Sequence, residues 1–150
     1  MNLWHYTTKD RLDEIIESGE IRTSTANRTG QSESATLWLS SNPIWEHTAT
    51  KLTSVGGTIR GLTKKEQHEL FGLGRIEVNT QNISFFSWST FVKNIAAKRH
   101  VARSMEVSGR TSGGNPNQWF GSTKPIPKVH FISAEVWDGN EWQVIQTEFK

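Results

Sequence analysis

The sequence predicts a single α+β domain, residues 1–150, in which helices pack around a mixed or antiparallel central sheet. Three observations lead to this prediction. Segments with the apolar and aromatic character of strands lie at both ends of the chain, and segments with helical periodicity lie between them. Strands and helices do not alternate regularly, as they would in a doubly wound fold. The length of 150 residues is that of one domain.

The N-terminal segment predicts a strand, a helix and a return. Residues 3–6 are apolar and aromatic, as in a buried first strand. Thr7 or Thr8 is expected to cap the helix that follows, and Gly19 is expected to end it in the left-handed conformation. The apolar stripe of this helix has the spacing i, i+3, i+4 and consists of Leu12, Ile15 and Ile16.

The next part of the chain predicts loops around a second buried strand. Residues 23–36 are rich in Ser, Thr, Gly and Asn and predict a long polar loop. Residues 37–39 predict a strand, which Pro43 ends. Residues 44–51 predict a short helix or turn, and the Gly56-Gly57 pair within 53–61 predicts a loop or hairpin tip.

Two helices and a strand are expected in the middle of the chain. Residues 63–66 form a capping-box sequence before a short helix that ends near Gly72. Residues 75–78 alternate as a strand does. The longest predicted helix covers 88–107 and stops at Gly109. Its apolar positions are Trp88, Phe91, Val92, Ile95, Ala96, Ala102 and Met105.

The C-terminal part predicts a stiff loop and a hairpin. Residues 119–127 join Trp-Phe-Gly to Pro-Ile-Pro, and we expect them to form a loop beside the functional cleft. Residues 129–137 and 142–145 predict two strands. The Asp-Gly-Asn sequence at 138–140 between them is a strong hairpin turn signal.

The composition excludes several kinds of chemistry. Without cysteine, the chain has no disulfide, no thiolate zinc site and no cysteine nucleophile. The five histidines show no metal-binding spacing, so no metal is expected. Phosphate-binding glycine loops and the Gly-x-Ser-x-Gly elbow of hydrolases are also missing from the sequence.

Hydropathy and charge bear on location and partners. No apolar run approaches the ~20 residues that cross a bilayer, so we expect no membrane partner. The chain opens without the basic and apolar regions of a signal peptide, which predicts a cytoplasmic protein. The net charge of +2 is weak, but cations cluster within 93–110. This cluster predicts either a solvated helix face or a surface that faces phosphate groups.

Two short segments are the candidates for function. His5, at the end of the first strand, is interpreted either as a core histidine bonded to backbone or as a hydrogen-bonding imidazole at a cleft. The second strand runs into Ser40, Ser41 and Asn42, and such polar strand ends often bind ligands. The alternative there is a plain Asn-Pro turn. We expect His5 and Ser40 to lie on neighbouring strands and to face one cleft.

The residues around His5 resemble the opening of ADP-ribosyltransferase-like folds. This group includes the tRNA 2′-phosphotransferases, DNA-modifying ADP-ribosyltransferase toxins and PARP-like enzymes. The chain is also similar to a set of bacterial and phage proteins with the signature WHYT … ILxxGxIxP … VWFSxNPxWExTA. The segments that carry the resemblance are Trp4 to Thr7, Ile15 to Arg22 and Leu37 to Ala49.

The resemblance implies a site for NAD, used as a substrate. It implies that His5 bonds the adenosine-side ribose and that the backbone near Thr7 pairs with the nicotinamide amide. It also implies a nicotinamide pocket, with Trp45 as its stacking wall. The residues that would line this pocket are Ser40, Ser41 and Asn42.

The chemistry of this reaction predicts further roles. Cleavage of the bond between nicotinamide and ribose develops positive charge on the sugar, which a carboxylate stabilises. Glu135 and Glu46 are the two candidates, and Arg75 is the candidate for the pyrophosphate. The acceptor of ADP-ribose would be nucleic acid or protein. Two alternatives stay open: a nucleotide-binding or phosphate-processing relative of the same fold, and a non-catalytic bacterial or phage protein that inhibits a host factor.

Overall fold

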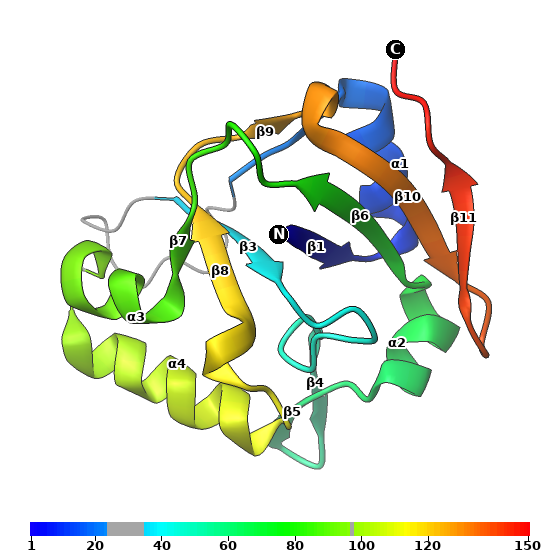
Figure 1. The fold of residues 1–150 in the computed structure, drawn as a ribbon. Coiled ribbons are helices and arrows are strands. Elements are labelled where there is room, and N and C mark those ends of the chain that lie inside the picture. The colour runs from blue at the N-terminus through cyan, green and yellow to red at the C-terminus, as the bar shows by residue number, and fades with distance from the viewer. Residues whose placement is uncertain (24–34, 97) are drawn as a thin grey trace.

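The chain folds around a seven-stranded sheet in which every neighbouring pair is antiparallel (Figure 1). The computed structural model describes residues 1–23, 35–96 and 98–150. The strand order is β11-β10-β6-β1-β3-β8-β7, with β1 at the centre. The strands are β1 (Asn2–Thr7), β3 (Leu37–Ser40), β6 (Gly74–Asn79), β7 (Phe86–Ser87), β8 (Trp119–Ser122), β10 (Phe131–Trp137) and β11 (Trp142–Gln146).

Short strand pairs and helices surround this sheet. Two small sheets pair β2 (Glu20–Ile21) with β9 (Ile126–Pro127), and β4 (Leu52–Val55) with β5 (Thr58–Gly61). The helices are α1 (Lys9–Ser18), α2 (Lys64–Phe71), α3 (Trp88–Thr90) and α4 (Arg99–Thr111), with a π-helical turn (Phe91–Ile95) and 3-10 turns at Pro116–Gln118 and Lys128–His130. The α+β class and the antiparallel sheet are thus confirmed.

None of the described helices combines the length and apolar character that crossing a bilayer requires.

The main apolar core lies between one face of the sheet and α1. Leu12 and Ile15 of α1 are buried against it, as the i, i+3 spacing predicted. Gly74 of β6 lets the helix come close, because a Cβ there would stand 2.8 Å from a Leu12 methyl. The sheet residues of this core include Leu3, Leu37, Leu39, Ile76, Val78 and Ala134.

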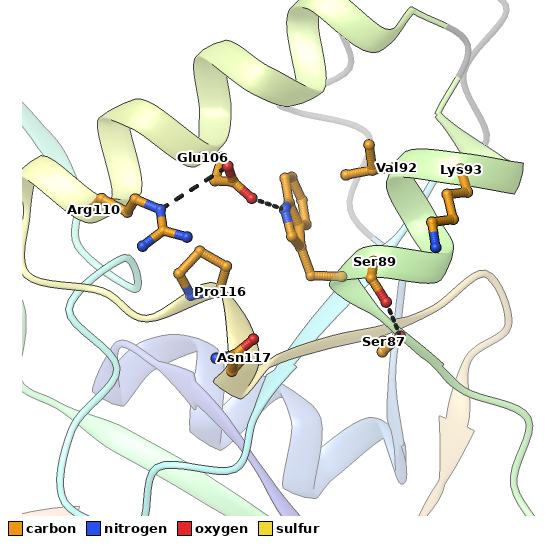
Figure 2. A pocket seen from close by; sticks show the side chains of 9 residues that line it. Ser87, Ser89, Val92, Lys93, Glu106, Arg110, Pro116 and Asn117 are labelled. Atoms are coloured by element: carbon orange, nitrogen blue, oxygen red, sulfur yellow. Dashed lines mark hydrogen bonds and ion pairs between the residues drawn. The ribbon is translucent and has the colours of Figure 1, made fainter.

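The opposite face of the sheet carries two aromatic clusters. In one, Trp88, Phe91 and Ala102 pack around Trp119 of β8. A cavity of about 320 Å³ opens beside this cluster, between α3, α4 and the turn at Pro116–Gln118 (Figure 2). The other cluster contains the buried residues Tyr6, Trp45 and Leu73, with Trp4, Trp137 and Trp142 packed against them.

Several local predictions are confirmed. Gly19 ends α1 with φ 78°, in the left-handed conformation that favours glycine. The capping box at α2 is complete, since the Thr63 side chain accepts from the Glu66 N–H and Glu66 accepts from the Thr63 N–H. Asp138 accepts two backbone bonds in the turn between β10 and β11, so the hairpin is also confirmed.

The long helix expected over 88–107 is wrong as a continuous element. The chain leaves helical geometry at Ala96, which has ψ 125°, and α4 starts anew after Lys98. In a straight helix, Trp88 and Ala102 would be about 21 Å apart along the axis. The break brings both residues into one buried cluster with Trp119, and burial of these apolar side chains favours the broken arrangement.

The loop predicted over 119–127 also needs correction. Residues 119–122 form β8, because Trp119 and Phe120 pair with β3 and alternate between the faces of the sheet, and residues 126–127 form β9, which pairs with β2. Residues 44–51 contain turns, which is one of the two alternatives predicted for them. Most of the polar loop predicted over 23–36 lies outside the described residues.

Close packing of α4 on the sheet gives the first prediction. A Cβ on Gly109 would stand 2.6 Å from Cζ2 of the buried Trp119 ring. Gly109→Ala should therefore lower the free energy of unfolding by about 1–3 kcal/mol, although alanine favours helices by ~1 kcal/mol. Urea unfolding measures this change. The exposed neighbour Ser108 supplies the control, since Ser108→Ala should not destabilise. A more stable Gly109→Ala variant would show that Trp119 moves freely.

Candidate functional site

The pairing between the central strand β1 and its neighbour β3 is short. β1 and β6 pair at six positions, from Asn2 with Asn79 to Thr7 with Gly74. Within the described strands, β1 and β3 pair at one position, Trp4 with Ser40. The two motif segments that the sequence singled out meet at this junction, although they lie more than 30 residues apart in the chain.

His5 links β1 to β3 across this junction. Its Nδ1 lies 2.8 Å from the carbonyl oxygen of Trp38. A carbonyl can only accept, so Nδ1 carries the proton and a neutral ring has Nε2 as its acceptor. Burial lowers the pKa of His5 below its ordinary value, and the charge of Arg11 lowers it further, against the effect of the Trp38 bond. The imidazole is therefore neutral at pH 7.

The expectation that His5 and Ser40 face one cleft is wrong. Directly paired residues of an antiparallel sheet point to the same face, so Ser40 shares the face of Trp4. His5 is the next residue along β1 and points to the other face, where its pair partner is Ile76 of the core. The expected residues are thus divided: His5 and Thr7 lie on the core face, and Arg75 lies on the face of Ser40.

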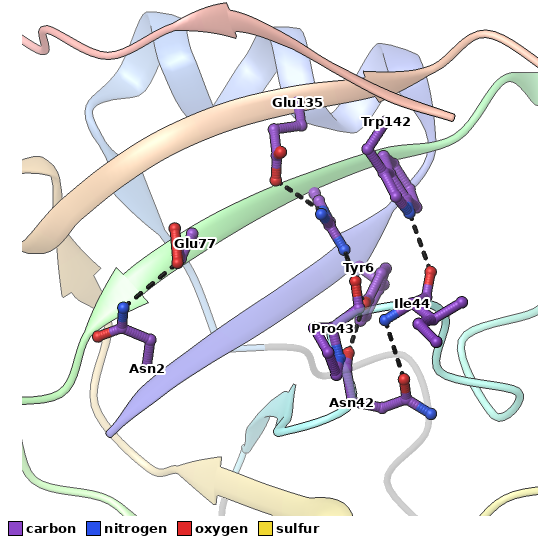
Figure 3. Close-up of polar contacts among 9 residues, drawn as sticks. Asn2, Tyr6, Asn42, Pro43, Ile44, Glu77, Glu135 and Trp142 are labelled. Carbon is purple, nitrogen blue, oxygen red and sulfur yellow. Dashed lines mark hydrogen bonds and ion pairs between the residues drawn. The ribbon is translucent and has the colours of Figure 1, made fainter. Parts of the chain in front are cut away.

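Arg75 is the centre of a buried polar network on that second face, and Figure 3 shows its partners Glu135, Tyr6 and Pro43. Its Nε donates to Oε2 of Glu135 at 2.7 Å, and the two side chains are only 9% and 12% exposed. Its Nη1 donates to the Tyr6 hydroxyl at 3.1 Å and to the Pro43 carbonyl. The Tyr6 hydroxyl in turn donates to the Asn42 carbonyl at 2.5 Å. The guanidinium therefore joins three strands to the loop that follows β3.

Glu46 holds that loop in place. Its Oε1 accepts from the Ser40 hydroxyl at 2.8 Å, and its Oε2 accepts from the hydroxyl and N–H of Thr48 at 2.6 and 3.0 Å. The side chain of Asn42 accepts from the N–H groups of Ile44 and Trp45, which turns the chain after Pro43. Both oxygens of the buried Glu46 are thus engaged in structural hydrogen bonds.

The other predicted pocket residues take part in the same loop. Asn42 donates through its side chain to Oε1 of Gln118 at 3.3 Å, and the Ser41 N–H donates to the Gln118 carbonyl at 3.0 Å. Trp45 is buried, edge-on to Tyr6 at a centroid distance of 5.3 Å. The loop therefore brings four of the predicted pocket residues together: Ser40, Asn42, Trp45 and Glu46. The hydrogen bonds that hold them run from one of these residues to another.

The aromatic cluster around Tyr6 binds two cations of the chain itself. The Arg75 guanidinium lies 4.4 Å from the ring centroid of Trp142, and Nζ of Lys64 lies 3.2 Å from that of Trp137. Burial lowers the pKa of Lys64, and the charge of Arg75 contributes. Of these residues, the sequence pointed to Arg75 alone and gave no role to Lys64, Trp137 or Trp142. The hairpin turn at 138–140 could have indicated that Trp137 and Trp142 are paired across β10 and β11.

Comparison with known protein families, functionally curated proteins and solved structures gives no significant match to this chain. Within the described part of the chain, no group of three or more histidine or acidic side chains has the arrangement of a metal site.

The buried ion pair gives the second prediction. Arg75→Met leaves the Glu135 carboxylate and the Pro43 carbonyl without their partner, so the free energy of unfolding should fall by about 3–5 kcal/mol. The matched control is Arg60→Met, because Arg60 forms an exposed pair with Glu66 at 2.8 Å, close to the 2.7 Å of the buried pair. That change should leave the midpoint of urea unfolding almost unaltered. Equal effects of the two substitutions would contradict the role given to Arg75.

The single tyrosine of the chain gives the third prediction. Burial raises the pKa of Tyr6 to about 12, although the charge and hydrogen bond of Arg75 act in the opposite direction. Phenolate absorbance should therefore appear near pH 12 in the native protein and near pH ~10 in denaturant. Because only the unfolded chain ionises in this window, stability should fall as the pH rises from 10 to 12. The Tyr6→Phe variant provides the reference spectrum without phenolate. Ionisation of Tyr6 near pH 10 in the native protein would contradict the burial of its hydroxyl.

Proposed function

We propose that this chain binds NAD and transfers its ADP-ribose to a nucleic acid or protein acceptor, as an ADP-ribosyltransferase-like protein. The observation that carries the proposal is the junction of β1 and β3, which His5 bridges through its bond to the Trp38 carbonyl. This junction connects two of the three segments on which the sequence resemblance rests, Trp4 to Thr7 and Leu37 to Ala49. A neutral imidazole fixed at one nitrogen presents the other as an acceptor for a ribose hydroxyl.

A cation near His5 suits the pyrophosphate of NAD. Arg11, on the first turns of α1, is exposed and close enough to His5 to lower its pKa. Arg75, which the sequence analysis assigned to the pyrophosphate, already bonds Glu135, Tyr6 and Pro43. We therefore assign the pyrophosphate to Arg11 and keep Thr7, half-buried at the end of β1, for the nicotinamide amide.

The carboxylates differ in what they could do for cleavage. Both oxygens of Glu46 accept bonds that fold its loop, so we assign it a structural role. Glu135 is the better candidate to stabilise positive charge on the ribose. It lies two strands away from β1 and on the face opposite His5, so the adenosine and nicotinamide ends of NAD would lie on different faces of the sheet.

A second candidate function is nucleotide binding without cleavage, within the same fold. The observation that favours it is the short ion pair between Glu135 and Arg75, which reduces the negative charge that Glu135 offers to a substrate. Release of nicotinamide from NAD separates the two candidates, since only the transferase produces it. The Glu135→Gln variant should abolish that release.

The NAD proposal gives the fourth prediction, tested by calorimetry and thermal unfolding on the same samples. His5→Asn keeps a side-chain N–H that can reach the Trp38 carbonyl but removes Nε2. Losing one hydrogen bond of ~1–2 kcal/mol should weaken NAD binding by roughly 5–30-fold while the melting temperature changes little. His5→Ala should lower both affinity and melting temperature, since it also leaves the Trp38 carbonyl unpaired.

The control for this experiment is His100→Ala, which removes an exposed histidine of α4. It should leave NAD affinity and melting temperature unchanged. A wild-type protein that binds no NAD at millimolar concentration would refute the proposal. If the His5→Asn variant bound NAD with wild-type affinity, the role of His5 would be limited to its hydrogen bond with the Trp38 carbonyl.

A further inference from the structure

Three arginines form an exposed stripe along α4. Arg99, Arg103 and Arg110 stand four and seven residues apart and are all exposed. At about 100° per residue they lie within an arc of roughly 40° on the helix, and they extend over about 16 Å of its axis. We call these three residues the arginine stripe.

Folding alone does not explain the stripe. Residues 88–118 contain five lysines and arginines and one carboxylate, Glu106. Glu106 accepts from the Trp88 indole at 2.9 Å and lies 4.0 Å from Arg110. No ion pair to Arg99 or Arg103 occurs within the described part of the chain, and like charges at i, i+4 repel. The helix dipole also disfavours cations in the first turn, where Arg99 stands.

The cavity beside α4 adds polar groups to this surface. Lys93 and Arg110 lie on opposite sides of it, and both are exposed (Figure 2). The serine hydroxyls of Ser87 and Ser89 and the amide of Asn117 line it as well. Its volume of about 320 Å³ exceeds that of a phosphate group. The Glu106 carboxylate lines it too, so the charged side chains around the cavity leave a net charge of +1. Cations together with neutral donors are the groups that bind phosphate oxygens.

We infer that the arginine stripe and this cavity bind the phosphate backbone of a nucleic acid strand. Guanidinium groups suit phosphate, since they are weakly hydrated and can bond two oxygens at once. The 16 Å length matches the axial rise of about five bases in one DNA strand. The inference goes beyond the NAD proposal and does not depend on it, because the surface lies on α4 and the His5 junction lies between β1 and β3.

The apolar residues of α4 argue against a membrane surface as the partner. Met105 and Val107 are its exposed large apolar side chains. They stand about 160° apart on the helix, so they form no common apolar face that could enter a lipid interface. Charge alone distinguishes this surface, which is the property that phosphate-backbone binding requires.

Fluorescence anisotropy with a labelled 20-nucleotide DNA, as single strand and as duplex, tests the inference. Arg99→Glu with Arg103→Glu should weaken binding by at least ~10-fold at 100 mM salt. It should also reduce the slope of log K against log salt by about two, since each cation accounts for about one released counterion. The matched control is Lys65→Glu with Lys150→Glu, which makes the same charge change at exposed positions outside α4.

A second pair of variants tests the cavity. Lys93→Gln and Arg110→Gln should each weaken binding several-fold and reduce the salt slope by about one. Circular dichroism confirms folding, and Arg99→Glu places a carboxylate where the helix dipole favours it. NAD calorimetry on the stripe variant should give wild-type affinity, which separates this inference from the NAD proposal.

Three outcomes would overturn the inference. The first is the absence of DNA binding by the wild type at 50 mM salt. The second is an equal loss of binding in the control pair, which would show that net charge alone is responsible. The third is binding to phosphatidylserine vesicles without binding to DNA, which would assign the surface to lipid.

Discussion

The buried charge of Arg75 is the constraint on which the second face of the sheet depends. A guanidinium away from water is costly unless hydrogen bonds and an opposite charge compensate it. Glu135, the Tyr6 hydroxyl and the Pro43 carbonyl supply these partners from two strands and a loop. Aromatic rings around the network exclude water, which strengthens each bond and penalises any arrangement that breaks one. The position of the 41–48 loop follows from this requirement.

The network also decides which groups are left for chemistry. Glu46 and Glu135 are both ionisable and both near strand ends, yet each is bonded to neighbours that the fold needs. His5 differs, because its structural bond uses one ring nitrogen and leaves the second for another partner. For this reason the proposed NAD site is centred on the junction of β1 and β3, while the cationic surface of α4 is assigned to a separate partner.

Local signals predicted much of the fold because their causes are local. Gly19 ends α1 since glycine alone adopts positive φ without strain, and Thr63 with Glu66 caps α2 through bonds that span three residues. The break after the π-helical turn and the strand at β8 were not predictable in this way. Both depend on Trp119, a residue distant in sequence from Trp88, whose burial outweighs the helical periodicity of 88–107. The pairing of Arg75 with Glu135, 60 residues apart, is likewise a tertiary event.

The sequence by itself determined the residue types at the candidate site, the α+β class, and the positions of most strands and helices, because periodicity and capping act over a few residues. The tertiary structure alone decided which of those residues share a face. The side-chain period of a strand is two, so the pairing of Trp4 with Ser40 sends His5 to the opposite side. An offset of one residue in that register would have brought His5 and Ser40 together. The strand register is set by the packing of whole faces of the sheet. On one face, Leu3, Leu37 and Leu39 pack in the apolar core with α1. On the other face, Arg75 bonds Glu135.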